Sequence, residues 1–320
     1  MTSEVTFQDT QLKSLPAAGG LEAVVGNTPL LPLRRVTAGP SSGVQVLVKA
    51  EWFNPGGSVK DRPALNILRV ALADGLLAPG KRLLDSTSGN MGIAYATFGA
   101  ALGIPVTLTL PANASPERIT VLRAMGAELI LTDPLEGSDG AIRVARRLAD
   151  EQPELYYYAN QYDNSANWQA HYFTTGPEIV QQTGGRLTHF VAGQGTSGTL
   201  TGVARYLRQY NPAIQIVAAQ PDSPFHGLEG LKHMPSAIRP ANFDPLLSDR
   251  TVEVPTEAAY TMVQRLAREE GLFVGISSGA AAQAALQVAG ELDRGIVVTV
   301  FPDAGYKYLS DKALWEEIRD

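Results

Sequence analysis

The rest of the chain is organised around the stretch Asn54-Pro55-Gly56-Gly57-Ser58-Val59-Lys60-Asp61-Arg62. The run 44–50 before it has the pattern of a short buried strand, Asn-Pro-Gly-Gly cannot continue that strand, and a helical pattern starts near Ser58. Lys60 is therefore predicted in a first helical turn, where the helix dipole and Arg62 disfavour an ammonium and lower the lysine's pKa. Such a lysine is a nucleophile and Schiff-base former, and the alternative is an exposed surface lysine.

Composition places the chain among ordinary globular proteins. Its 320 residues, 44% hydrophobic and 18% charged, are enough for two domains of moderate size. A net charge of −6 gives no electrostatic footprint for nucleic acid or an anionic membrane. The absence of cysteine excludes disulfides, thiolate metal sites and cysteine nucleophiles. The histidines lack metal-ligand spacing, so no metal site is predicted; they are His171, His189, His226 and His233.

No targeting or membrane segment is expected. The first twenty residues carry Glu4, Asp9 and Lys13 and contain no apolar core of about seven residues, so they do not resemble a signal peptide. No stretch approaches the roughly 18 apolar residues of a membrane span. We therefore expect a cytoplasmic protein that neither crosses nor binds membranes.

From Val44 onward, short β-branched runs alternate with longer amphipathic stretches, which is typical of an α/β protein with a parallel sheet. Strands are predicted at 44–49, 82–85, 106–110, 128–132, 155–158, 189–192, 214–219, 251–254 and 296–301. Helices are predicted at about 62–75, 92–103, 115–126, 138–151, 167–183, 198–210, 256–271, 278–290 and 310–318. The stretch Ser223–Ser248 is the one long loop, and loops of that length tend to be functional or mobile.

The glycine-rich loop 193–202 follows a predicted strand and opens a helix, so its backbone amides form an anion site. Its spacing also fits G-x-G-x-x-G, but a dinucleotide site requires an acidic residue about 20 residues further on, where Gln220-Pro221 stands. A single phosphomonoester is therefore favoured, with a dinucleotide and a plain tight turn as alternatives. The hydroxyls that suit a phosphate are those of Thr196, Ser197 and Thr199.

Two further turns precede predicted helices. The stretch Ser86–Gly92 is rich in hydroxyls and can hold a carboxylate at a helix N-terminus, or can simply cap the helix. Ser277 precedes the helix 278–290, where the alternative to a ligand contact is an N-cap. Gln161 follows a strand, where an amide is commonly just a turn residue.

Five motifs in one order resemble the cysteine synthase and cystathionine β-synthase family of pyridoxal phosphate enzymes. They are Gly26-Asn27-Thr28-Pro29-Leu30, Asn54–Arg62, Ser86-Thr87-Ser88-Gly89-Asn90-Met91-Gly92, Gly193-Gln194-Gly195-Thr196-Ser197-Gly198-Thr199 and Gly275-Ile276-Ser277-Ser278-Gly279. The similarity covers about residues 21–312. It implies an α/β fold of fold type II, like the tryptophan synthase β subunit, with two three-layer domains on mainly parallel sheets. The smaller, mobile domain is expected at 51–160, and the larger at 1–50 plus 161–320.

The resemblance also implies a pyridoxal 5'-phosphate cofactor and a set of contacts. Cofactor contacts are expected from Lys60, Asn90, Gly195, Thr196, Ser197, Gly198, Thr199, Ser277 and Asp303, and substrate contacts from Thr87, Ser88, Gly89, Asn90, Met91 and Gln161. Asn90 would bond the cofactor's ring oxygen, and Ser277 would face its pyridine nitrogen, where a neutral hydroxyl suits β-replacement over transamination. Met91 departs from the family's usual threonine, although a backbone contact would survive that change.

The implied reaction is cysteine synthesis by β-replacement on O-acetylserine or O-phosphoserine, with sulfide or thiosulfate, through an α-aminoacrylate. Lys60 would hold the cofactor and act as the general base. The stretch 301–310 looks more like cysteine synthase B than the A form, and Gly230-Leu231-Lys232-His233 falls where B-type members carry basic residues, which makes an anionic substrate plausible. A homodimer is the family's usual state. The alternatives are cystathionine β-synthase chemistry with homocysteine and a binding protein of the same fold without catalysis.

Overall fold

The structure is a computed structural model that describes residues 19–37, 43–87 and 89–315. The predictions about the first eighteen residues, Ser88 and the end of the helix 310–318 lie outside these residues. Within the described residues no helix is both long and apolar enough to cross a membrane.

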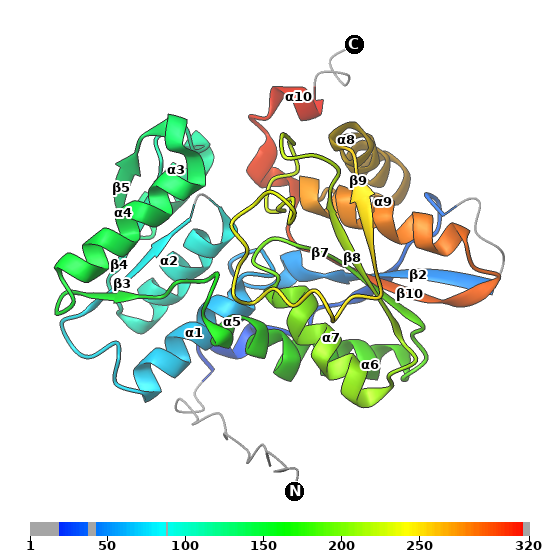
Figure 1. Cartoon of the computed structure of the whole chain (residues 1–320), viewed down its shortest axis with the longest axis horizontal. Helices are drawn as coiled ribbons and strands as arrows, with labels where there is room; N and C mark the ends of the chain where they lie inside the picture. Colours follow the sequence, from blue (N-terminus) through cyan, green and yellow to red (C-terminus); the bar gives the residue numbers. More distant parts are fainter. Residues whose placement is uncertain (1–18, 38–42, 88, 316–320) are drawn as a thin grey trace, which may run out of the picture.

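The strands form two separate sheets (Figure 1). The smaller sheet is fully parallel in the order β5-β4-β3-β6, and the larger has the order β1-β2-β10-β7-β8-β9, in which only β1 runs antiparallel to its neighbour. The strands are β1 (Leu30–Pro32), β2 (Gly43–Ala50), β3 (Arg82–Ser86), β4 (Val106–Pro111), β5 (Glu128–Thr132), β6 (Tyr156–Tyr158), β7 (His189–Gly193), β8 (Gln215–Pro221), β9 (Arg250–Val254) and β10 (Arg294–Phe301).

Helices cover both faces of each sheet. In the smaller half α1, α2 and α3 lie on one face and α4 on the other, and in the larger half α8 and α9 lie opposite α6 and α7 (Figure 1). The helices are α1 (Asp61–Ala73), α2 (Asn90–Leu102), α3 (Pro116–Ala124), α4 (Gly137–Glu151), α5 (Ser165–Ala170), α6 (Gly176–Thr183), α7 (Gly198–Tyr210), α8 (Thr256–Arg265), α9 (Ile276–Gly290) and α10 (Lys312–Trp315). The α/β class and the mainly parallel sheets are confirmed.

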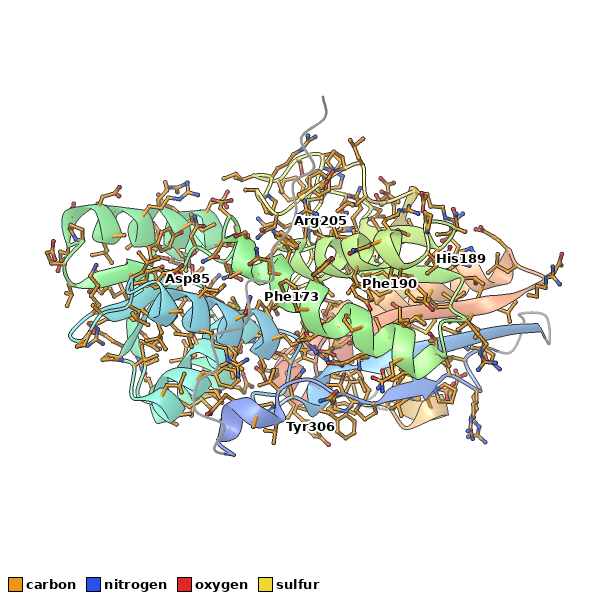
Figure 2. The ribbon with its side chains drawn as sticks, turned by 90° about the horizontal axis from the view of Figure 1, so that it is seen from below. Asp85, Phe173, His189, Phe190, Arg205 and Tyr306 are labelled. Carbon is orange, nitrogen blue, oxygen red and sulfur yellow. The ribbon has the colours of Figure 1, made fainter. Side chains whose placement is uncertain are left out.

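Successive residues of the central strands are buried on opposite faces, as a sheet covered on both sides requires. Leu83 packs with α1 and α2, whereas Leu84 packs with Ala145 of α4. In the larger sheet Phe190 faces the α7 side and Val191 the α9 side. Figure 2, seen from below, places Asp85 in the half built on the smaller sheet and Phe190 in the other half.

The predicted elements match the observed ones closely, with a few informative differences. Strand β1 was not predicted, because three residues ending in proline carry no periodic pattern. The predicted helix 167–183 is one helical stretch that contains a π turn at His171–Thr175 between α5 and α6. No helix or strand lies in 223–248, as expected of the long loop. The division into domains at 51–160 and the remainder stays a prediction.

A buried ion cluster ties the lysine loop to the larger half. Arg62 of α1 contacts Glu51 at 2.7 Å and Glu178 of α6 at 2.6 Å, and all three side chains are almost fully buried. Lys49 of β2 contacts Glu178 at 2.6 Å, and the Thr28 hydroxyl donates to Glu51. Burial alone would lower the pKa of Arg62, but the two carboxylates raise it, so the guanidinium stays charged. The cluster therefore fixes the start of α1.

Replacing Arg62 with methionine is expected to lower the free energy of unfolding by about 3–5 kcal/mol, because two buried carboxylates would then share only Lys49. Urea unfolding followed by circular dichroism measures this loss. Arg250→Met is the matched control, since Arg250 also contacts a glutamate, Glu291, at 2.7 Å, but both side chains are more than 40% exposed. That control is expected to lose less than about 1 kcal/mol. Equal losses in the two variants would contradict the structural role of the cluster.

Candidate active site

A cavity of about 470 Å³ lies between the two sheets, at the carboxyl ends of their parallel strands. Its volume is in the range that holds a small-molecule ligand, and this edge of an open α/β sheet is where such proteins bind ligands. The sequence-predicted residues that line it are Lys60, Thr87, Gly89, Asn90, Met91, Gln161, Gly195, Thr196, Ser197, Gly198, Thr199 and Ser277. Residues from distant parts of the chain thus meet around one space.

Lys60 lies at the N-cap position of α1 and lines the cavity. Its pKa is lowered, as predicted from the sequence. Burial lowers the pKa and the charge of Asp303 raises it, while the expected effect of the helix dipole stays a prediction. Arg62 is not the cause, because its guanidinium is neutralised by Glu51 and Glu178. The alternative of an exposed surface lysine is wrong. A half-buried amine with a lowered pKa facing a cavity suits nucleophilic and base chemistry.

The loop between β7 and α7 has the features of an anion site. A side chain on Gly195 would overlap the carbonyl oxygen of Gly230, and one on Gly198 would overlap the Asn167 side chain. Ser197 adopts a left-handed conformation (φ 63°) at the N-cap of α7. Its hydroxyl is buried and has no hydrogen-bond partner within the described part of the chain. The two glycines thus let the loop pack closely against Gly230 and Asn167, and a buried hydroxyl is left for a ligand.

Two neighbouring hydroxyls of this loop are held by buried side chains. Thr196 accepts a hydrogen bond from the Asn167 amide at 3.2 Å. The hydroxyl of Thr199 lies 3.2 Å from His171 Nε2, and His171 Nδ1 lies 2.9 Å from the Thr175 hydroxyl. Burial keeps the pKa of His171 well below its usual range, so the ring is neutral. These contacts orient the loop, and the neutral His171 ring adds no positive charge to it.

The turn before α2 partly caps that helix, which is the alternative to carboxylate binding that the sequence left open. The hydroxyl of Thr87 accepts hydrogen bonds from the amides of Gly89 and Gly92, both at 3.2 Å. Met91 is 2% exposed and packs in the core of the smaller half, although it also reaches the cavity wall. Ser88 lies outside the described residues. The capping contacts leave the other residues of the turn at the cavity, so a ligand contact there is compatible with the cap.

Gln161 is not only a turn residue, and Ser277 is not an N-cap. Gln161 is 3% exposed, and its side-chain amide donates to the Ser86 carbonyl at 3.0 Å, which joins β6 to the end of β3. Ser277 is the second residue of α9, whose N-cap is Gly275, so the N-cap interpretation is wrong. Its side chain lies at the cavity wall. Both residues are positioned to contact a ligand.

Asp303 is fully buried and is not among the described residues that line the cavity. Its Oδ2 accepts hydrogen bonds from the Asn90 amide at 2.7 Å and from the Tyr308 hydroxyl at 2.9 Å. Burial raises its pKa, while Lys307, Asn90 and Tyr308 lower it. Asp303 therefore reaches the cavity through Asn90, and its predicted place on the ring-nitrogen side of a cofactor stays a prediction.

Charged side chains also line the cavity. Lys232 lines it, with its ammonium 5.1 Å from the centre of the Tyr162 ring, and burial lowers the lysine's pKa. His233 instead contacts Ser236 and does not line the cavity. Arg118 of α3 pairs with Glu229 of the loop 223–248, so this ion pair joins the two halves across the cavity.

Sequence reasoning missed Arg118, Tyr308 and Lys307. Arg118 follows Pro116-Glu117 at the start of a predicted helix, where a charged residue is unremarkable. Lys307 and Tyr308 belong to the stretch 301–310, whose sequence predicts no partner for either side chain. Their roles depend on partners far away in sequence. Among the described residues no cluster of three or more acidic or histidine side chains suits a metal ion.

The family model of the pyridoxal-phosphate dependent enzymes matches residues 21–303. The chain belongs to this family. Its cofactor is therefore pyridoxal 5'-phosphate, and it is an enzyme that acts on small molecules. The expected fold type II is confirmed by solved structures of the same family.

Similar proteins carry related names. The chain is 53% identical over 292 residues to a cysteine synthase of Aquifex aeolicus, covering 90% of this chain and 89% of that one. It is 42% identical to cysteine synthase B of Escherichia coli, covering 93% and 96%. A crystal structure of cysteine synthase from Entamoeba histolytica superimposes with a TM-score of 0.89 at 34% identity, covering 98% of this chain and 94% of that one.

The residues present fit the family's cofactor. The unpaired hydroxyl of Ser197, at the N-terminus of α7, suits its phosphate, because that group accepts several hydrogen bonds and helix N-termini bind anions. Lys60 supplies an amine on another wall of the same cavity. The site therefore has both a phosphate cradle and a lysine.

Replacing Gly195 with alanine is expected to weaken cofactor binding and lower the free energy of unfolding by about 1–3 kcal/mol, because the new Cβ would overlap backbone. Cofactor titration and urea unfolding measure the two effects. Gly290→Ala, at the end of α9 with open space around it, is the control and is expected to be neutral or stabilising by up to about 1 kcal/mol. If Gly195→Ala behaves like this control, the loop does not depend on its close packing against Gly230.

Proposed function

We propose that this protein is a cysteine synthase, which replaces the β-substituent of an activated serine with a sulfur nucleophile. The observation that carries the proposal is the position of Lys60, whose amine shares one cavity with the glycine loop 195–199. The similarity to the cysteine synthases of Aquifex aeolicus and Escherichia coli supports the choice of reaction. O-Acetylserine and sulfide are the proposed substrates.

In this proposal each wall of the cavity has its own task toward the cofactor. Lys60 would hold it covalently through Nζ, and Asn90 would donate a hydrogen bond to its ring oxygen. Ser277 would face the pyridine nitrogen with a neutral hydroxyl, and Asp303 would support Asn90 through their hydrogen bond. The phosphate would be held by the loop residues Gly195, Thr196, Ser197, Gly198 and Thr199. When bound, pyridoxal phosphate supplies the electron sink for bond breaking at the substrate's Cα.

The chain's own groups then position the substrate and move one proton. The turn Thr87–Met91 and the amide of Gln161 bind the substrate carboxylate, with Met91 contributing its backbone. Lys60 Nζ would remove the proton from Cα, and acetate would leave from Cβ. Sulfide would then add at Cβ, and Lys60 would return the proton to Cα, so that cysteine is the product. The lowered pKa of Lys60 supports this base role, because more of the amine is neutral at a given pH.

The choice of donor and sulfur source is a finer proposal. Lys232 at the cavity wall supports an anionic alternative, such as O-phosphoserine or thiosulfate. Chemistry of the cystathionine β-synthase type, with homocysteine, is less favoured, because the named relatives are cysteine synthases. The nucleophile that is consumed distinguishes the two.

Three further properties rest on the family resemblance: a homodimeric state, a cytoplasmic location and closure of the part 51–160 over the substrate. The ion pair between Arg118 and Glu229 supports the last, because it spans the cavity. Sedimentation, cell fractionation and hydrogen exchange with and without substrate test them in turn.

Lys60→Ala is expected to lower the rate of cysteine formation from O-acetylserine and sulfide by about 10²–10⁴-fold, the contribution of a positioned general base. It is also expected to abolish attachment of the cofactor by borohydride reduction, measured by mass spectrometry of the intact protein. Lys81→Ala, on the loop before β3, is the control. It is expected to keep both the rate of cysteine formation and the attachment of the cofactor.

The proposal fails if wild-type protein forms no cysteine, or if it consumes homocysteine faster than sulfide. Including thiosulfate and O-phosphoserine in the same assay identifies an anionic substrate. Borohydride attachment that persists in Lys60→Ala would place the reactive amine elsewhere.

A further inference from the structure

The side chain of Asn90 is hydrogen-bonded to one acidic and one basic side chain. Its side-chain Nδ2 donates to Oδ2 of Asp303 at 2.7 Å, and its Oδ1 accepts from the ammonium of Lys307 at 2.5 Å. An ammonium has protons to donate and no lone pair to accept with, whereas an ionised carboxylate only accepts. The two partners therefore distinguish the two ends of the amide.

A reversed amide would bring its NH₂ group against the ammonium of Lys307 and its oxygen against Asp303. Both charge-assisted hydrogen bonds would be lost, and both new contacts would be repulsive. In the observed orientation one Nδ2 proton is used by Asp303. The second remains for a group in the cavity that Asn90 lines.

Lys307 is itself held in place. It belongs to a short 3-10 helix, Gly305–Tyr308, that follows β10, and its ammonium also donates to the carbonyl of Gly57 at 3.1 Å. The preceding residue, Tyr306, is 69% exposed on the outer surface at the bottom of Figure 2, while Lys307 turns inward. The lysine thus joins the C-terminal segment to α2 and to the loop that carries Lys60.

We propose that Lys307 is a positioning residue that fixes the rotation of the Asn90 amide, so that an N–H group faces the ring oxygen of the cofactor. The proposal rests on the proposed contact between Asn90 and that oxygen. It does not depend on which donor or nucleophile the enzyme uses. A carbonyl oxygen in place of the N–H would repel the ring oxygen instead of binding it.

The test compares two cofactors on the full-length chain, stripped and reconstituted: pyridoxal phosphate and its analogue without the ring 3-hydroxyl. Lys307→Met keeps the length of the side chain and removes the donor. It is expected to weaken binding of pyridoxal phosphate by about 10–100-fold, the effect of a hydrogen bond that involves charge. It should leave binding of the analogue within about twofold of wild type. Lys307→Arg, which keeps a charged donor, restores the affinity.

A structural role would weaken both cofactors equally, because the contact with Gly57 does not depend on the 3-hydroxyl, and that outcome overturns the proposal. Unchanged affinity for pyridoxal phosphate overturns it as well. Lys307→Leu also removes the donor and serves as the second variant if Lys307→Met does not fold, with the same comparison of the two cofactors. In the Asn90→Ala background, Lys307→Met should have no further effect, and a full additional loss contradicts action through Asn90. Since the readout is binding, failure here is distinct from failure to make cysteine.

Discussion

The buried contacts of Arg62 with Glu51 and Glu178 are the constraint on which the site depends. They hold the first turn of α1 against the larger half, so that Lys60, two residues earlier, reaches the cavity rather than solvent. A buried ion pair of this kind is costly to desolvate and adds little net stability, but breaking it leaves an unpaired buried charge. Its consequence here is geometric, because it determines where one amine lies.

A second set of polar contacts links the start of α2 to the C-terminal segment. Asp303, Lys307 and Tyr308 follow β10 and meet Asn90 at the start of α2. Lys60 and Asn90 thus both come from the smaller half, at the starts of α1 and α2, and both helix starts are tied to the larger half by side-chain hydrogen bonds or ion pairs. The lysine and the amide therefore line the same cavity.

The elements and the site loops were predictable because their signals are local. Pro55-Gly56-Gly57 after a strand pattern predicted the turn before α1, and the glycine spacing after β7 predicted an anion loop. The expected effect of Arg62 on the pKa of Lys60 was wrong, because Glu51 and Glu178 neutralise Arg62, and Glu178 lies 116 residues away. The role of Lys307 was missed for the same reason, since Asn90 is 217 residues distant. Such pairings arise only when the strands are ordered in sheets.

The measurement that tests the central claim most directly is the visible absorption spectrum of the purified protein, recorded before and after O-acetylserine and again after sulfide. The account predicts a band from the lysine-bound cofactor that changes when O-acetylserine is added and returns when sulfide releases cysteine. A protein that shows no band even after reconstitution with pyridoxal phosphate would contradict the assignment of Lys60. A band that does not respond to O-acetylserine would contradict the proposed reaction.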